Sequence, residues 1–278
     1  MSDYRRFMIL SGPRTGSHML AQALNSAPHI VCFREVFNGR LDFIQYQVDG
    51  YDDFSERDIA LRKDDPVRFL RERIFCDHPE GVRAVGFKFH YGHQWDFPGI
   101  LEALTGDAGL HVIRLERRNL LRMLVSLKLA ETTGVWLQDG TSKVTPANAL
   151  RAVRHPIKAA RRVGRLFSRP TPSGGDGPAQ RVTISVDECY QFMVSTELRY
   201  ENFDKLFERH PTLQLYYEDM VADRAAVFRD AQVFLGVEPA PLEVTLRQQN
   251  PEPLRDLITN YDELREAFKD SPQAAFFD

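Results

Sequence analysis

Short apolar runs alternate along the chain with helix-type patterns, and this alternation predicts an α/β protein. Five runs rich in β-forming and apolar residues are interpreted as strands, at 6–11, 30–33, 82–90, 110–116 and 213–219. Apolar residues recur at helical spacing in 17–26, 118–131 and 221–236. Gly236 closes the last of these patterns, where a helix commonly ends in a left-handed residue.

The order of these elements predicts how the strands pair. Strands that alternate with helices pair in parallel through right-handed crossovers. We therefore expect a P-loop-like three-layer sandwich, with a central parallel sheet between helices. Ligands of such sheets bind beyond the carboxyl ends of the strands. The turns after 6–11 and 110–116 and the end of 82–90 should then lie along one rim.

One stretch departs from this alternation, at about 132–181. Its part 151–170 carries Arg and Lys without any Asp or Glu, and the Gly- and Pro-rich 171–178 follows. The segment is interpreted as a basic, mainly helical insertion in a single domain that spans 1–278. It is either a solvated insertion or a basic lid or face that meets an anionic substrate or a lipid surface.

Charge, hydropathy and cysteine spacing disfavour a nucleic-acid-binding, a membrane-spanning and a secreted protein. The chain has 278 residues and a net charge of −3, so the field of the whole molecule gives no reason to expect nucleic acid as a partner. No segment has the length of a membrane span or a secretory signal, which favours a cytoplasmic protein. Cys32, Cys76 and Cys189 lack the spacing of a metal or redox motif and fit reduced thiols.

The turn after the first predicted strand has the form of an anion-binding loop. Its sequence is Gly-Pro-Arg-Thr-Gly-Ser, at 12–17. Gly12 and Gly16 allow a tight turn that aims backbone N–H groups at the start of a helix, and Arg14 adds a charged fork. A kinase or GTPase would need Gly-Lys-Ser/Thr at the end of this loop, whereas Ser17 and His18 follow Gly16.

A second candidate phosphate-binding motif, called here the 3′ grip, lies at the start of the helix after the fourth predicted strand. Arg118 and Ser126 are eight residues apart, close to two helical turns, and therefore lie near one side of that helix. An arginine and a serine so placed could bind a second phosphate, away from the first loop.

Together these two motifs resemble the sulfotransferases that use 3′-phosphoadenosine 5′-phosphosulfate (PAPS), nearest to the bacterial carbohydrate and nodulation-factor type. The resemblance extends to 215–237 and 247–268, whereas 40–80 and 132–181 match nothing in the family. It implies that the 5′-phosphosulfate binds to Pro13, Arg14, Thr15, Gly16, Ser17 and His18. It places Arg118, Ser126 and Arg247 on the 3′-phosphate. Many relatives have Thr where His18 stands.

The acceptor must lose a proton, so the site requires a general base. In the relatives with a carbohydrate acceptor a Glu after the second strand has this role, which implies Glu35. His90 is the rival, because other sulfotransferases use His. Lys88 lies on the opposite pleat face from Phe87 and Phe89, so it needs a polar partner, either the sulfuryl group or a carboxylate.

The predicted function is transfer of a sulfuryl group from PAPS to a hydroxyl or amine of a carbohydrate, glycolipid or small metabolite, with PAP as product. Arg14, Glu35, Lys88 and His90 are the candidate catalytic residues. No metal is expected, since His90 and His93 lack a third ligand in the sequence pattern. A P-loop kinase or a non-catalytic nucleotide-binding module is the alternative. The acceptor's identity and the oligomeric state stay open.

Overall fold

The computed structural model describes residues 4–39, 55–133, 180–246 and 248–277. These residues form two compact units along the chain. The first comprises 1–123 and 187–244, and the second 124–186 and 245–278. The single domain therefore stays a prediction, and most of the segment 132–181, together with Arg247, lies outside the described residues.

The first unit is built on a five-stranded parallel sheet with the order β2-β3-β1-β4-β5. The strands are β1 (Arg5–Ser11), β2 (Ile30–Phe33), β3 (Ala84–His90), β4 (His111–Glu116) and β5 (Thr212–Tyr216). All five predicted strands are confirmed. The fifth ends earlier than expected, because Tyr217, Glu218 and Asp219 begin a helix and do not continue the strand.

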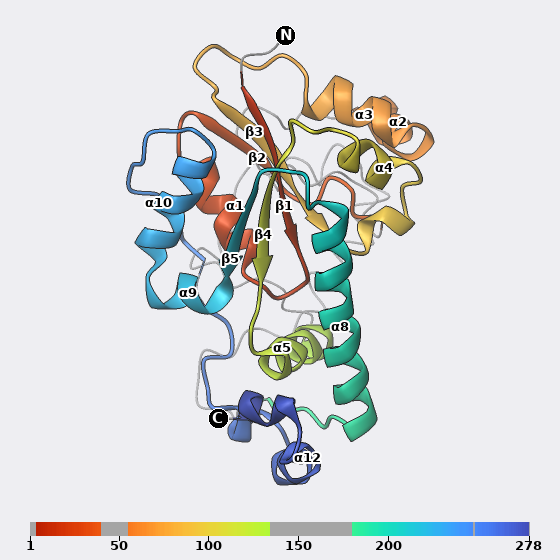
Figure 1. Ribbon diagram of the computed structural model, residues 1–278, viewed down its shortest axis with the longest axis vertical. Helices are drawn as coiled ribbons and strands as arrows, with labels where there is room; N and C mark the ends of the chain where they lie inside the picture. The colour runs from red at the N-terminus through yellow and green to blue at the C-terminus, as the bar shows by residue number, and fades with distance from the viewer. Residues whose placement is uncertain (1–3, 40–54, 134–179, 247, 278) are drawn as a thin grey trace, which may run out of the picture. The chain divides into compact units, whose positions relative to one another are not determined.

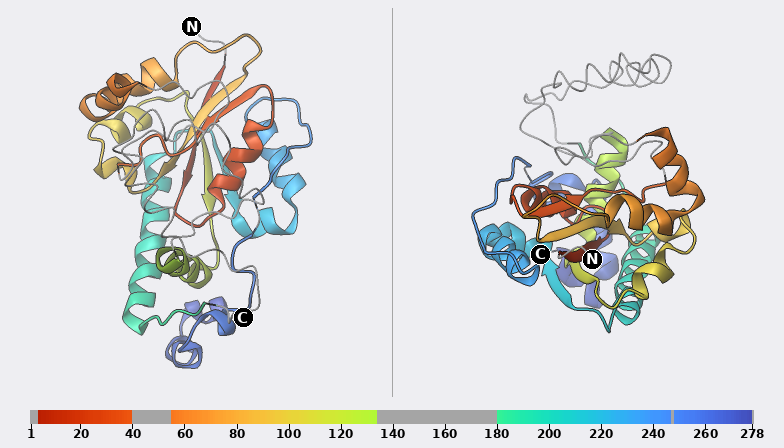
Figure 2. Two further views of the ribbon diagram at one scale, coloured as in Figure 1. Left: turned by 180° about the vertical axis from the view of Figure 1, so that it is seen from behind. Right: turned by 90° about the horizontal axis from the view of Figure 1, so that it is seen from above.

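Helices cover both faces of this sheet, which confirms the predicted α/β fold. They are α1 (Ser17–Asn25), α2 (Glu56–Asp64), α3 (Pro66–Phe69), α4 (Ile100–Thr105), α9 (Tyr217–Ala222), α10 (Arg224–Phe234) and nearly all of α8 (Val186–Leu206), with a π-helical turn η1 (Leu70–Ile74) and a 3-10 turn η2 (His93–Trp95). In Figures 1 and 2, α1 and α10 lie on one side of the sheet, and α8 with α3 and α4 on the other. Gly236, after α10, has a φ of 69°, as its position predicted.

Alternation along β3 places phenylalanine side chains on one face of this strand and a lysine on the other. Phe87 and Phe89 are fully buried and pack with Phe37 in an aromatic cluster, with ring centroids 5.4 and 6.3 Å away. Lys88 lies between them in sequence and is also fully buried, but it points to the other face. Each of these aromatic side chains stabilises the fold by about 1.5–3 kcal/mol through burial.

The second unit contains most of α5 (Leu120–Thr133), together with α11 (Leu254–Leu257), α12 (Tyr261–Phe268) and a 3-10 helix η3 (Pro272–Phe277). A parallel bridge joins Val182 to Ile258, and the amide of Asn260 bonds the backbone of Ile184 through both its oxygen and its nitrogen. No described helix in either unit has both the length and the apolar character needed to cross a membrane.

Candidate active site

The loop between β1 and α1 has the tight, left-handed geometry of an anion-binding turn. Arg14 has a φ of 62° and Gly16 a φ of 82°. A Cβ at Gly16 would lie 2.5 Å from Cε of Met220, so this position requires glycine on steric as well as conformational grounds. Gly16 is the N-cap of α1 and provides no side-chain cap, which leaves the first turn of the helix facing the loop.

In this loop Thr15 stabilises the backbone, whereas Arg14 provides a positive charge. The hydroxyl of Thr15 donates to the carbonyl of Gly12 over 3.0 Å, and both Thr15 and Ser17 are buried. Burial, and next the neighbouring charge of Arg117, lower the pKa of Arg14 to about 10. Arg14 therefore remains a cation at neutral pH, as an anion-binding loop requires.

A buried ion pair lies at the carboxyl edge of the neighbouring strands. Nζ of Lys88 is 2.6 Å from Oε1 of Glu35 and 2.7 Å from Nδ1 of His18. The side chains of Lys88 and Glu35 are 1% and 10% exposed. Asn38 donates to the other carboxylate oxygen of Glu35 over 2.6 Å. Glu35, after β2, and His18, in the first turn of α1, thus both contact the ammonium of Lys88 on β3.

The charges of this cluster are set by competition between burial and the ion pair. Burial alone would raise the pKa of Glu35, but the ammonium of Lys88 holds it well below its ordinary value. Burial lowers the pKa of Lys88 to about 8 against the opposing effect of Glu35. At pH 7 the pair is therefore ionised on both sides.

Three histidines surround the pair and are neutral. Nε2 of His18, His90 and His93 lies 3.8, 3.9 and 4.0 Å from the carboxylate of Glu35. Burial is the main cause that lowers the pKa of each ring, and Lys88 adds to it. The rings of His90 and His93 stack, with centroids 5.0 Å apart.

Glu35, His90 and His93 also have the composition of a metal site, with ligand atoms within 4.8 Å of one another. The surrounding hydrogen bonds do not fit this use. Nδ1 of His93 accepts the backbone N–H of His90 over 3.2 Å, so the neutral ring carries its proton on Nε2, the nitrogen nearest to Glu35. A cation would also have to displace Lys88 from Glu35. The expected absence of a metal stays a prediction.

The second predicted grip lies after β4, next to the donor loop's strand in the sheet. Arg118 forms a two-pronged ion pair with Asp219, at 2.6 and 2.8 Å, and its guanidinium lies 3.9 Å from the centre of the Tyr216 ring. This side chain is 50% exposed. Asn119 caps α5 by accepting the N–H of Arg122, and Ser126 is buried two turns along that helix.

The structure thus brings together Glu35, Lys88, His18 and His90, whereas it pairs Arg118 with an acid of α9. Sequence reasoning missed Asn38, the acid Asp219 and the buried Arg117, which donates to the carbonyl of Arg14 over 3.1 Å. The signal for the pairing of an arginine with Asp219 was present. Arg-Arg follows β4, and Tyr-Tyr-Glu-Asp begins at the last residue of β5. Neighbouring parallel strands bring such segments together.

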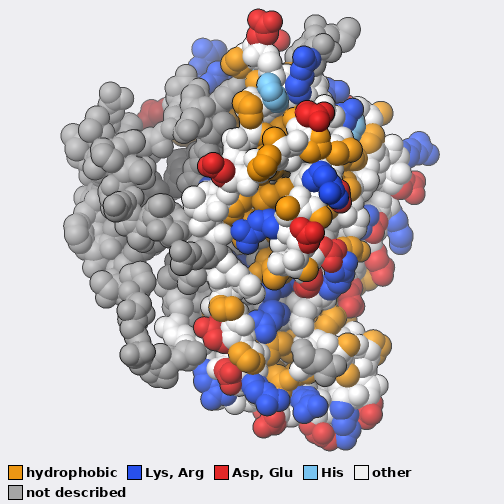
Figure 3. Space-filling view, turned by 90° about the vertical axis from the view of Figure 1, so that its left-hand side faces the viewer, with side chains coloured by type: hydrophobic (Ala, Val, Ile, Leu, Met, Phe, Trp, Pro, Cys, Tyr) orange, Lys and Arg blue, Asp and Glu red, His pale blue; other side chains and the backbone are white. Residues whose placement is uncertain are grey.

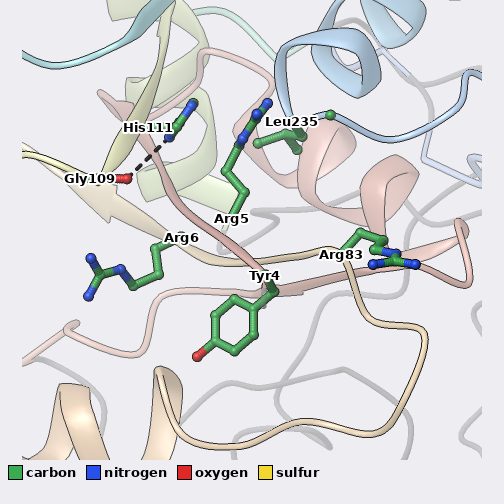
Figure 4. Close-up of a pocket in the computed structure, with 8 residues that line it drawn as sticks. Tyr4, Arg5, Arg6, Arg83, Gly109, His111 and Leu235 are labelled. Carbon is green, nitrogen blue, oxygen red and sulfur yellow. Dashed lines mark hydrogen bonds between the residues drawn. The ribbon is translucent and has the colours of Figure 1, made fainter. Parts of the chain in front are cut away.

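A cavity of about 390 Å³ lies elsewhere, at the amino ends of the strands (Figure 4). Tyr4, Arg5, Arg6, Arg83 and His111 are among its lining residues. Two of its three arginines are already engaged, because Arg5 donates to the carbonyl of Phe234 and Arg6 pairs with Asp107 at 2.8 Å. In Figure 3, positive and negative side chains are interspersed over the described part of the face shown.

The loop after β1 has the geometry of an anion-binding turn without the lysine of nucleoside-triphosphate loops, and the arginine turn follows the adjacent strand β4. No protein-family model matches the chain. The chain is 27% identical to nodulation protein H of Rhizobium tropici over 98% of its length and 92% of the relative. It is 25% identical to nodulation protein H of Rhizobium meliloti strain 1021, over 98% of the chain and 94% of the relative.

Two solved structures were also found to be similar. A sulfotransferase from Alicyclobacillus acidocaldarius has 17% identity and a TM-score of 0.47, covering 100% of this chain and 94% of that one. Retinol dehydratase in a complex with retinol and PAP has 13% identity and a TM-score of 0.31, covering 85% and 61%.

The sequence similarity to nodulation H proteins spans almost the whole chain, and the loop 12–17 and Arg118 follow the adjacent strands β1 and β4. The predicted resemblance to nodulation-type sulfotransferases is therefore confirmed, and sulfotransferase is the class of enzyme that the comparisons support.

Proposed function

We propose that this sulfotransferase moves the sulfuryl group of PAPS to a hydroxyl, or an amine, of a carbohydrate, glycolipid or small metabolite. The observation that carries this proposal is the position of Lys88, whose ammonium contacts both Glu35 and His18. The candidate base and the start of the donor-loop helix therefore meet at one point. A nucleotide kinase is disfavoured. Its phosphate-binding loop would have Lys and then Ser or Thr after the last glycine, whereas Ser17 and His18 follow Gly16.

The donor loop would bind the 5′-phosphosulfate. The uncapped start of α1 and the charged Arg14 both favour an anion at this place. Negative charge develops on the bridging phosphate oxygen as the sulfur–oxygen bond breaks, and Arg14 would stabilise it there. Pro13, Thr15, Gly16 and Ser17 would shape the loop around this group, and Arg118 and Ser126 would bind the 3′-phosphate.

The transfer itself needs one proton acceptor. The acceptor oxygen forms a bond to sulfur while the bond from sulfur to the phosphate oxygen breaks, so that PAP leaves. The proton of the acceptor passes to Glu35. A carboxylate held at low pKa by Lys88 is a weak base, so we propose that Lys88 moves from Glu35 to the bound donor. Because the charge of Lys88 then no longer offsets the effect of burial, the pKa of Glu35 rises and its carboxylate becomes a stronger base.

His90 is the second candidate base. It is neutral, its side chain is 18% exposed, and its Nε2 lies 3.9 Å from Glu35. If Glu35 served only to orient Lys88, His90 could accept the proton instead. Glu35→Gln and His90→Asn separate the two, because turnover should fall far more in the variant that lacks the base.

Radiolabelled PAPS and a panel of candidate acceptors test the proposal directly. The protein should transfer the label to at least one hydroxyl-bearing acceptor, and PAP should raise its melting temperature through preferential binding to the folded state. Stabilisation by ATP with Mg²⁺, and none by PAP, would favour the kinase alternative.

Three cysteines without a disulfide are consistent with action in the reducing cytoplasm.

A further inference from the structure

The arginine directly before the predicted 3′-phosphate residue points into the fold, toward the donor loop. Arg117 and Arg118 follow β4 side by side in sequence, but their side chains are 5% and 50% exposed. A buried guanidinium is costly unless it is paired, so its position calls for a reason. Sequence reasoning gave Arg118 a role and left Arg117 without one.

The contacts of Arg117 are with the donor loop and with an aromatic ring behind it. Its Nη1 donates to the carbonyl of Arg14 over 3.1 Å. Its guanidinium lies 4.3 Å from the centre of the Tyr217 ring, and its Nε is 4.0 Å from the carboxylate of Glu218. The same Tyr217 ring backs the loop at Gly16, where an added Cβ would lie 2.9 Å from Cδ2.

Arg117 and Tyr217 therefore act on the two loop residues with left-handed backbones, Arg14 and Gly16. Glycine adopts this conformation freely, whereas for arginine it is unfavourable and must be imposed by the surroundings. A hydrogen bond to the carbonyl of Arg14 fixes the peptide that follows this residue. Loss of that bond would allow Arg14 to relax toward an ordinary conformation and move its guanidinium.

The 3′-phosphate grip is held by different contacts. The carboxylate of Glu218 accepts the backbone N–H groups of Arg118 and Asn119, at 3.0 and 3.2 Å. Asp219 binds the Arg118 guanidinium itself. Arg117 donates none of these hydrogen bonds, and its only link to them is the 4.0 Å approach of its Nε to Glu218, so a change there should affect the loop more than the 3′ grip.

We propose that Arg117 is a positioning residue of the donor loop, which holds Arg14 in its left-handed conformation so that the loop can receive the 5′ end of the donor. This inference rests on the proposed function, since it assumes that the loop binds the 5′-phosphosulfate. It implies that Arg117 never touches the transferred group and acts only through Arg14.

Nucleotides with a single phosphate test this role. In calorimetric titrations, Arg117→Met should weaken binding of adenosine 5′-monophosphate about tenfold, the value of one charge-assisted hydrogen bond. Binding of adenosine 3′-monophosphate should change less than about twofold, because the hydrogen bonds from Arg118 and Asn119 to Glu218 and from Arg118 to Asp219 are kept. Arg118→Met is the matched control and should show the opposite pattern.

A second variant guards against loss of folding. Arg117→Gln keeps an N–H donor near the carbonyl of Arg14 and should recover part of the 5′-monophosphate affinity relative to Arg117→Met. The inference would be overturned if Arg117→Met folded with unchanged 5′ affinity, if Arg117→Gln bound the 5′-monophosphate no better than Arg117→Met, or if Arg117→Met weakened both nucleotides equally. If the wild-type protein bound neither PAP nor PAPS, the proposed function itself would be refuted. That result differs from the variant results that would refute only the role of Arg117.

Discussion

Substitution of Lys88 by methionine removes the cation of the buried pair and leaves Glu35 without a charged partner. The two side chains are 1% and 10% exposed, and their charged atoms are 2.6 Å apart. Removal of one member of a buried ion pair typically costs about 3–5 kcal/mol of folding free energy, because the other charge stays desolvated. We expect a loss of this size for Lys88→Met near pH 8.

The loss should depend on pH, and its sign follows from the pKa of Glu35. In the wild-type protein this pKa lies below its ordinary value, so Glu35 is ionised at pH 5 and at pH 8. Without Lys88, burial raises it, and a buried Glu can reach a pKa of about 8–9. A carboxyl with a raised folded pKa stabilises the folded state increasingly as pH falls through that value. The cost of Lys88→Met should therefore shrink by at least about 1.4 kcal/mol, one pKa unit, from pH 8 to pH 5.

Urea denaturation of the wild-type protein and of Lys88→Met at both pH values measures this difference. The double variant Lys88→Met/Glu35→Gln is the control, since it removes the second charge and should recover most of the stability at pH 8. An equal loss at both pH values, or a double variant no more stable than Lys88→Met, would refute the reasoning that an unpaired Glu35 charge is the cause.

The remaining predictions concern turnover and donor binding. Glu35→Gln should lower kcat by at least about 100-fold, the usual contribution of a general base, while the Kd for PAP changes less than about threefold, as calorimetry and steady-state kinetics would measure. Lys88 should lose its charge above about pH 8, so kcat/KM for PAPS should fall there, and Lys88→Arg should remove this alkaline decline. Asp219→Asn should release Arg118 and tighten PAP binding about two- to fivefold without affecting adenosine 5′-monophosphate, because exposed ion pairs are weak. Unchanged PAP affinity in Asp219→Asn would mean that the acid does not compete with the 3′-phosphate.

The sheet could be predicted from the sequence because its strands are short, apolar and followed by clear turn or helix signals. The loop after β1 and the acid after β2 could be placed on one rim for the same reason. The end of β5 was predicted wrongly, since Tyr216 and Tyr217 both have strand propensity. Tyr217 instead begins α9, with its ring against Gly16 and Arg117. Tertiary contacts decided this boundary.

Other parts of the first unit gave no usable signal. Helix α8 has 21 residues, but its apolar positions do not repeat cleanly, and it was not predicted. The contact of Lys88 with Glu35 depends on two segments far apart in sequence, so the sequence could only require some polar partner for Lys88. The use of Arg117 was hidden for a different reason. Two consecutive arginines look alike in a sequence, and only packing makes one buried and the other exposed.

A crystal structure of the protein with PAP would test the central claim most directly, which is that both grips hold one nucleotide at the same edge of the sheet. We predict the 5′-phosphate within about 3 Å of backbone N–H groups of the loop 12–17, and the 3′-phosphate on Arg118, released from Asp219. A nucleotide bound elsewhere, or a 5′-phosphate that makes no contact with this loop while Arg118 remains on Asp219, would contradict the account.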